Sequence, residues 1–123
     1  MEKFKIEIAN LFQEHRQTLN LVIKNQENNI LKSSKIISNC LKGKGTVFWC
    51  GNGGSASDSL HLSAELIGRF HKNRKPLRSI SLAGNSSTIT SISNDFGYHN
   101  VFSRQINALG KKNDVLVAIS TSG

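Results

Sequence analysis

The chain has 123 residues, 37% of them hydrophobic, and 16 Lys and Arg against 8 Asp and Glu give a formal net charge of +8. Its length suits one domain with a real core, and it contains no run of about 18 apolar residues that would predict a transmembrane helix. The first residues are too polar for a signal peptide, so we expect a cytoplasmic protein. The two thiols, Cys40 and Cys50, are expected to be reduced core residues, not disulfide partners or ligands.

Helical spacing dominates the first third of the chain. Apolar residues recur every three or four positions over residues 3–24, which predicts a long amphipathic helix. We expect the polar stretch at 25–29 to interrupt or end this helix, and residues 30–41 to form a second one. Lysines and glycines at 42–45 are typical of a helix C-terminus. Residues 1–45 are therefore predicted to form an N-terminal helical arm.

The remainder alternates strands with helices. The expected strands are 46–50, 78–82 and 114–119, and the expected helices are 55–70, 88–93 and 101–109, with a loop and N-cap at 84–87 and a turn at 94–97. The third strand is apolar throughout, as a strand buried on both faces should be. Such alternation predicts an α/β fold with parallel strands, right-handed crossovers and a ligand site beyond the carboxyl ends of the strands.

The densest basic segment covers residues 71–78 and contains the single proline. It has no interleaved aromatic residues, so a solvated loop is the favoured interpretation. A recognition surface for an anionic partner is the alternative that the net charge leaves open.

Two polar loops follow predicted strands. The first consists of Asn52, Gly53, Gly54 and Ser55, and the second of Ser120, Thr121 and Ser122. The backbone N–H groups of the first, at a helix N-terminus, could bind a phosphate or a hydroxyl-rich ligand. It lacks a P-loop lysine and dinucleotide-binding spacing, and a tight turn with Ser55 as N-cap is the alternative. The second loop could hold a phosphate or be an ordinary polar loop.

The helix after the glycine loop carries His61, Glu65 and Arg69 at four-residue spacing, which places them on one face. His61 and Glu65 could bind zinc, although two ligands do not complete a site, and a plain surface pair is the alternative. Glu65 could also act as a general base. Arg69 could bind an anion or pair with Glu65. Asn94 and Asp95 could contact sugar hydroxyls or belong to an ordinary turn.

Several motifs in a fixed order resemble one known family. They are Cys50-Gly-Asn-Gly-Gly-Ser55, His61-x-x-x-Glu65-x-x-Gly68-Arg69, Asn94-Asp-Phe-Gly97, Phe102-Ser-Arg-Gln105 and the segment from Asp114 to Gly123. Together they look like the sedoheptulose 7-phosphate isomerases, or phosphoheptose isomerases, of the sugar-isomerase (SIS) domain family. The resemblance covers essentially the whole chain.

The resemblance implies a flavodoxin-like α/β fold, with residues 46–123 as the N-terminal part of a SIS domain. It implies a cytoplasmic homotetramer with active sites between subunits, and neither a membrane nor a nucleic-acid partner. The implied reaction converts D-sedoheptulose 7-phosphate to D-glycero-D-manno-heptose 7-phosphate, toward the heptose of lipopolysaccharide. Such an aldose–ketose exchange needs a carboxylate base, a group that stabilises charge, and a clamp for the remote phosphate.

Carried over by position, the resemblance also implies the site. Zinc would be bound by His61 and Glu65, and Glu65 would also be the catalytic base that moves a proton between C1 and C2 through an enediol. The remaining substrate contacts would come from Asn52, Gly53, Gly54, Ser55, Arg69, Asn94 and Asp95, with the phosphate held by Ser120, Thr121 and Ser122.

Members of this family are longer, and a C-terminal helix supplies them with a Gln and a His as further metal ligands. We therefore expect this chain to be truncated at its C-terminus, and to fold poorly and be inactive if it is complete. One alternative is a non-enzymatic SIS protein that binds the bacterial replication initiator. Another is a sugar-phosphate sensor domain, which the lack of a DNA-binding motif disfavours.

Overall fold

The computed structural model describes all residues from Met1 to Gly123. The chain divides into two compact units, Met1–Lys35 and Ile36–Gly123. None of its helices combines the length and apolar character needed to cross a membrane.

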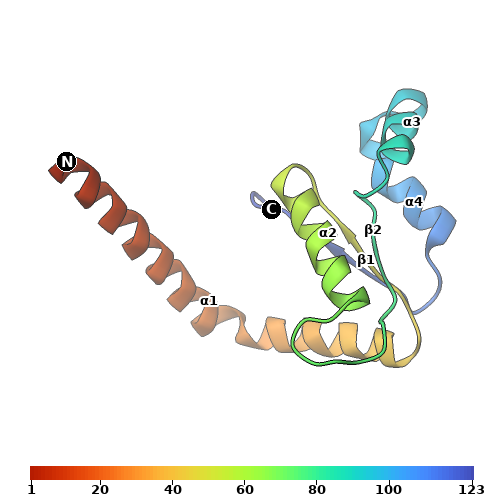
Figure 1. Cartoon of the computed structure of the whole chain (residues 1–123), viewed down its shortest axis with the longest axis horizontal. Coiled ribbons are helices and arrows are strands. Elements are labelled where there is room, and N and C mark those ends of the chain that lie inside the picture. The colour runs from red at the N-terminus through yellow and green to blue at the C-terminus, as the bar shows by residue number, and fades with distance from the viewer. The chain divides into compact units, whose positions relative to one another are not determined.

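Helix α1 (Glu2–Lys42) is one uninterrupted helix, so the expected break at 25–29 is wrong (Figure 1). The polar stretch contains neither Gly nor Pro, and Asn and Gln cost a helix only a few tenths of a kcal/mol per residue, roughly. Its side chains also bond to one another, since Asn29 Nδ2 donates to Gln26 Oε1 over 2.8 Å. The helix ends where expected, with Gly45 N–H donating to the Cys40 carbonyl at 2.8 Å.

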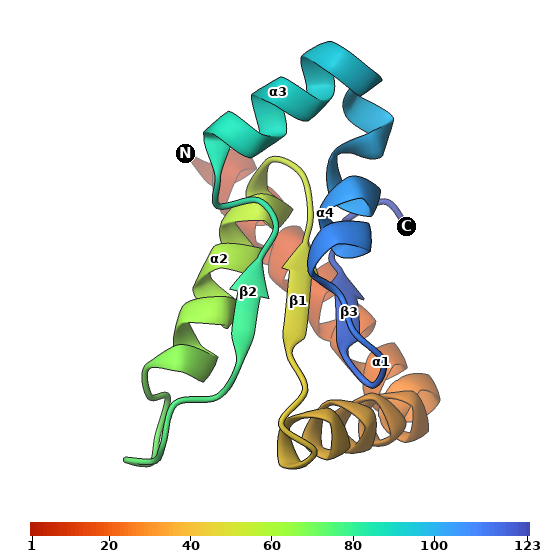
Figure 2. The same ribbon diagram turned by 90° about the vertical axis from the view of Figure 1, so that its right-hand side faces the viewer.

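Three parallel strands form one sheet with the order β2-β1-β3. Their bounds are β1 (Val47–Cys50), β2 (Ser79–Ser81) and β3 (Val115–Ala118). Figure 2 shows β1 in the middle, all three strands pointing the same way, and helix α3 (Ser86–Phe96) beyond their carboxyl ends. This confirms the predicted parallel α/β fold, and the strand order is that of a flavodoxin-like sheet.

The core has one layer on each face of β1, because successive strand residues point to opposite sides. Val47 and Trp49 pack with Cys40 on one face. Phe48 and Cys50 pack with Leu82 on the other. The first layer is completed by partly buried Ile37, Leu41, Leu66, Val115, Val117 and Ile119, and the second by Phe102 and Ile106. Both cysteines are free and buried, as predicted, and burial raises the pKa of each thiol.

Strand β3 is not buried on both faces, contrary to expectation. Its side chains alternate between partly buried and exposed, and Leu116 is 47% exposed. The physical reason lies in its position at a sheet edge, where Val115 and Val117 reach the first core layer. On the other face, Phe102 and Ile106 of α4 (Val101–Leu109) cover β1 and leave Leu116 uncovered.

The bounds of α2 and α3 also differ from the predictions. Helix α2 (Gly54–Ile67) stops three residues early, where Gly68 N–H donates to the Ala64 carbonyl at 2.8 Å. Helix α3 continues through 94–96, which we expected to be a turn, and ends at Gly97. The N-cap expected within 84–87 is Asn85, whose side chain accepts from Thr88 N–H at 3.0 Å. The helix therefore begins at Ser86, two residues before its predicted start. A short 3₁₀ turn, η1 (Tyr98–Asn100), then leads into α4.

The basic segment is a loop, as favoured, but two of its arginines make structural hydrogen bonds. The Arg74 guanidinium donates to the carbonyls of Glu65 and Leu66, each at 2.8 Å, and so satisfies the C-terminal end of α2. Arg78 Nε donates to Thr46 Oγ1 at 3.1 Å, beside the start of β1. The lysines of the loop, Lys72 and Lys75, are exposed.

Candidate functional site

The two polar loops lie at the same edge of the sheet, as predicted. Cys50 and Ala118 are register partners at the carboxyl ends of β1 and β3, and Ile119 N–H donates to the Cys50 carbonyl at 2.9 Å. The glycine loop and the serine-rich loop therefore begin side by side. An anion at this edge would meet hydroxyl and backbone donors from both loops.

The glycine loop is tightly folded. A Cβ on Gly51 would lie 2.6 Å from the Ser55 carbonyl oxygen, so only glycine allows this close approach. Ser55 N–H donates to the Asn52 carbonyl at 3.0 Å, and Ala56 N–H donates to the Gly53 carbonyl at 3.1 Å. The N–H groups of Gly53 and Gly54 take no part in these turn bonds and lie at the N-terminal end of α2. This is the arrangement in which backbone donors bind an oxyanion.

Ser55 does not cap the helix, so that alternative is wrong. The N-cap is Gly53, which has no side chain to cap with, and Ser55 lies in the first turn with only 6% of its surface exposed. Asn52 and Gly54 are exposed. The loop thus offers backbone groups and the Asn52 amide to a ligand, whereas the Ser55 side chain faces the interior.

In the second loop, Ser120, Thr121 and Ser122 are all exposed. Ser120 Oγ accepts from Gly123 N–H at 2.9 Å, which curls the loop on itself. The hydroxyls of Thr121 and Ser122 are left for a ligand or for solvent.

The pair predicted on α2 is present. His61 Nε2 lies 3.5 Å from Glu65 Oε1, with the imidazole 74% exposed and the carboxylate 29% exposed. A cavity of about 280 Å³ adjoins the pair, and its walls are mostly apolar. Its other lining residues are Ile37, Trp49, Leu62, Leu66, Phe70 and Arg74. A half-buried carboxylate next to an apolar wall is suited to proton transfer as well as to metal binding.

The donor set supplies part of a zinc site. Imidazole nitrogen and carboxylate oxygen are both zinc ligands, and one helix face presents them together. No group of three or more His, Cys, Asp or Glu side chains is gathered anywhere in the chain. His61 and Glu65 would therefore supply two ligands, and the rest of the coordination would have to come from outside the described residues.

Arg69 does not share the face of His61 and Glu65, contrary to expectation. Helix α2 ends at Ile67, so Arg69 lies two residues beyond it in the following segment, where it is exposed. It makes no ion pair with Glu65, whose carboxylate lies next to the His61 imidazole. The four-residue spacing holds only while the backbone stays helical, and Gly68 ends the helix.

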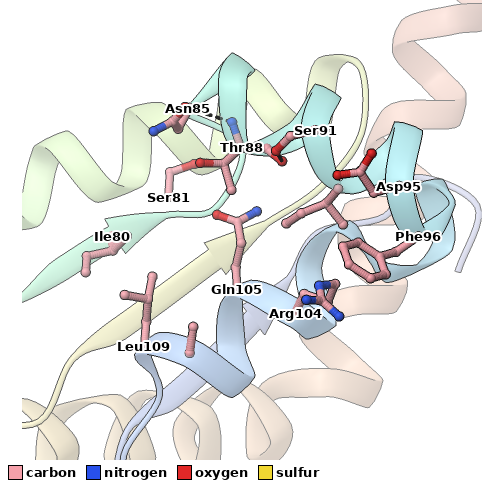
Figure 3. A pocket seen from close by; sticks show the side chains of 12 residues that line it. Ile80, Ser81, Asn85, Thr88, Ser91, Asp95, Phe96, Arg104, Gln105 and Leu109 are labelled. Atoms are coloured by element: carbon pink, nitrogen blue, oxygen red, sulfur yellow. Dashed lines mark hydrogen bonds between the residues drawn. The ribbon is translucent and has the colours of Figure 1, made fainter.

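Asn94 and Asp95 lie in the last turn of α3, with Asn94 Nδ2 donating to Asp95 Oδ1 at 3.1 Å. Asp95 lines a cavity of about 580 Å³ between β2, α3 and α4. Figure 3 shows Asp95, Phe96 and Arg104 at one end of this cavity. The Arg104 guanidinium stacks on the Phe96 ring, 3.6 Å from its centroid. The cavity adjoins α3 and α4, whereas the two polar loops follow β1 and β3.

Tyr98 contacts the glycine loop, which the sequence did not indicate. Its hydroxyl donates to Asn52 Oδ1 at 2.5 Å, and so joins η1 to the glycine loop across 46 positions of sequence. A single tyrosine after a turn carries no signal that predicts this contact. It links the segment that holds Asn94 and Asp95 to the loop that holds Asn52.

Comparisons with known proteins agree with this fold. A family model described as a SIS domain matches residues 10–123. A phosphoheptose isomerase of Campylobacter jejuni is 51% identical over 94 residues, which cover 76% of this chain and 50% of that protein. One from Helicobacter pylori is 45% identical over 112 residues, which cover 91% of this chain and 58% of that protein.

Solved structures give the same result. A phosphoheptose isomerase from Neisseria gonorrhoeae superposes with a TM-score of 0.87 at 35% identity, over 96% of this chain and 61% of that one. A phosphoheptose isomerase from Francisella tularensis superposes with a TM-score of 0.88 at 32% identity, over 94% of this chain and 60% of that one. The chain thus spans about half to three fifths of the length of these relatives. Because the family model covers nearly all of it, the chain belongs to the SIS domain family.

Proposed function

We propose that this chain is part of a phosphoheptose isomerase, an aldose–ketose isomerase that interconverts D-sedoheptulose 7-phosphate and D-glycero-D-manno-heptose 7-phosphate. The observation that carries the proposal is the meeting of two polar loops at one sheet edge, close in sequence to a helix that presents His61 and Glu65 together. Similarity to proteins named phosphoheptose isomerase supports the same substrate class. The His61–Glu65 pair favours this function over a non-enzymatic role in binding the replication initiator.

Each of the two loops would bind a different part of the substrate. Ser120, Thr121 and Ser122 would hold the phosphate through exposed hydroxyls and backbone donors. Asn52, Gly53 and Gly54 would contact sugar oxygens through the Asn52 amide and free N–H groups. Binding the phosphate at a distance from the reacting carbons orients C1 and C2 without taking part in the chemistry.

Glu65 would carry out the proton transfer. In the ketose-to-aldose direction its carboxylate removes a proton from C1, and the electron pair left behind converts the C2 carbonyl into an enediolate oxygen. The proton of the C1 hydroxyl then passes to the C2 oxygen, and the same carboxyl returns its proton to C2 as the C1 carbonyl forms. A single base can serve both carbons because they are neighbours on one face of the enediol. Glu65 is 29% exposed, so it is reachable by substrate yet partly shielded from water.

We also propose that His61 and Glu65 bind zinc together with further ligands that residues 1–123 do not gather around the pair. Zinc in this position would polarise the substrate oxygens and stabilise the negative charge that develops on them. A cytoplasmic homotetramer serving the heptose of lipopolysaccharide completes the proposal, since the family resemblance implies each of these properties.

The test is turnover of sedoheptulose 7-phosphate by the chain, with zinc supplied, followed by chromatographic detection of the aldose product. We expect Glu65→Gln to lower the rate by a factor of about 10² or more, because a carboxamide cannot accept the proton. Glu27→Gln, the same change at an exposed position of α1, is expected to leave the rate unchanged. Equal and measurable rates for Glu65→Gln and the unmodified chain would exclude Glu65 as the base, whereas no turnover by the unmodified chain would count against the proposed activity of this chain.

A further inference from the structure

We propose that Tyr98 is a positioning residue, which fixes the side-chain amide of Asn52 so that its Nδ2 faces the ligand of the glycine loop. The inference rests on the proposed function, because Asn52 is one of the residues expected to contact the sugar. It adds a residue that the family motifs in the sequence did not mark.

In the structure, the atom of Asn52 that meets the Tyr98 hydroxyl is Oδ1. An O–H···O hydrogen bond spans about 2.5–3.0 Å, and an N–H···O bond about 2.7–3.2 Å. The observed 2.5 Å fits the hydroxyl donating to Oδ1. One lone pair of Oδ1 is therefore engaged, which fixes the amide plane, and the Nδ2 donors stay free, since Asn52 is exposed and Nδ2 has no partner within the chain.

A fixed orientation determines what Asn52 can bind. With Oδ1 occupied, the side chain presents a donor beside the free N–H groups of Gly53 and Gly54. All three then favour an oxygen acceptor, such as a carbonyl, a hydroxyl oxygen or a phosphate. A freely rotating amide would offer Oδ1 half of the time and would have to be ordered on binding, which weakens affinity.

A turn of the backbone at Gly97 places Tyr98 within hydrogen-bond distance of Asn52. Gly97 has a φ of +83°, in the region that favours glycine, and it turns the chain from α3 into η1. A Cβ at Gly97 would also lie 2.8 Å from Cε1 of His99. Tyr98 is 55% exposed and belongs to neither core layer, so its specific interaction is the hydroxyl contact with Asn52.

The first experiment is a double-mutant cycle on binding of sedoheptulose 7-phosphate by the chain. We expect Tyr98→Phe to weaken binding by about fivefold, the worth of one hydrogen bond. Asn52→Ala should weaken it too, and Tyr98→Phe should have no further effect in the Asn52→Ala background. Ser103→Ala, which removes another exposed hydroxyl near η1, should bind like the unmodified chain. Losses that multiply in the double variant would overturn the inference.

The second experiment needs no ligand. Tyr98 is the single tyrosine, so labelling tyrosine with ¹³C at Cζ gives one signal, which reports on the hydroxyl. We expect Asn52→Ala to move this signal and Ser103→Ala to leave it in place. An unmoved signal in Asn52→Ala would overturn the inference even if the sugar phosphate binds. A moved signal with no sugar-phosphate binding by the unmodified chain would overturn the proposed function and leave the hydrogen bond established.

Discussion

Asp114 shows how one carboxylate can hold two segments of this fold. Its Oδ1 accepts from Thr46 N–H at 2.7 Å, just before β1, and its Oδ2 accepts from Lys111 N–H at 2.8 Å, in the turn before β3. The hydrogen bond from Thr46 is the main reason that the pKa of Asp114 lies below its ordinary value. The side chain therefore helps to start β1 and β3 in register.

Replacing Asp114 by Asn should lower the free energy of unfolding by about 1–2 kcal/mol at pH 7. One of the two backbone N–H donors would then face the amide NH₂ group, which cannot accept a hydrogen bond. A pKa lowered by folding contributes stability that is present above the unfolded value near 3.8 and is lost as the pH falls through the folded value. The difference between the two proteins should therefore shrink below about pH 4. Urea unfolding at pH 7 and pH 3 measures this. The control is Asp58→Asn, an exposed carboxylate on α2; a pH-independent difference for Asp114→Asn would contradict the prediction.

At the scale of elements, α2 depends on a residue that follows it in the chain. A helix leaves its last carbonyls without partners, and Arg74 supplies two N–H donors to those of Glu65 and Leu66. The same loop contact brings Leu77 N–H to the Leu66 carbonyl at 3.1 Å. The loop thus closes back onto the helix whose last turn carries Glu65.

Arg74→Ala should lower the free energy of unfolding by about 1–2 kcal/mol, because two carbonyls lose charge-assisted hydrogen bonds. Arg74→Lys should recover only part of this loss, since an ammonium lacks the planar fork that reaches both carbonyls at once. Lys72→Ala, an exposed charge of the same loop, should have little effect. Chemical denaturation compares the three. A loss for Lys72→Ala equal to that for Arg74→Ala would show that the charge of the loop matters, and not the helix cap.

At the scale of the whole molecule, burial and hydrogen bonding between strands are concentrated at β1. Every residue of β1 is buried, and both neighbours are parallel strands hydrogen-bonded to it. Residues of the unit Met1–Lys35 are exposed throughout. An exposed helix opens readily in water, whereas the amides of a central strand open only when the sheet does.

We therefore expect amide hydrogen exchange to be slowest in β1 and at least roughly 100-fold faster across Met1–Lys35, when the chain is kept dilute enough to be monomeric by light scattering. Residues of β3 should exchange at intermediate rates, because one of its edges is open. Mass spectrometry of peptic fragments reports each segment separately. Protection of Met1–Lys35 equal to that of β1 under these conditions would contradict this picture.

Much of this fold could be predicted from the sequence, since apolar periodicity, glycines and caps are local signals. The strand-loop-helix order from Val47 to Ile67, the cap at Asn85 and the helix ending at Gly110 all follow from neighbouring residues. Predictions from local signals were wrong where residues that favour a helix and residues that favour a turn lie side by side. Polar residues at 25–29 stayed helical because none of them forces a break, and α3 continued to Phe96 because only Gly97 adopts a conformation that ends it.

The sequence by itself determined the parallel α/β fold, the two polar loops and the pairing of His61 with Glu65, because each depends on chain order or helical spacing. Tertiary structure alone decided that α4 packs over β1 and leaves Leu116 of β3 exposed. It also decided the contacts between distant residues, namely Arg74 with the end of α2, Asp114 with Thr46, and Tyr98 with Asn52. Such contacts depend on how elements pack in space, and no pattern along one segment records that.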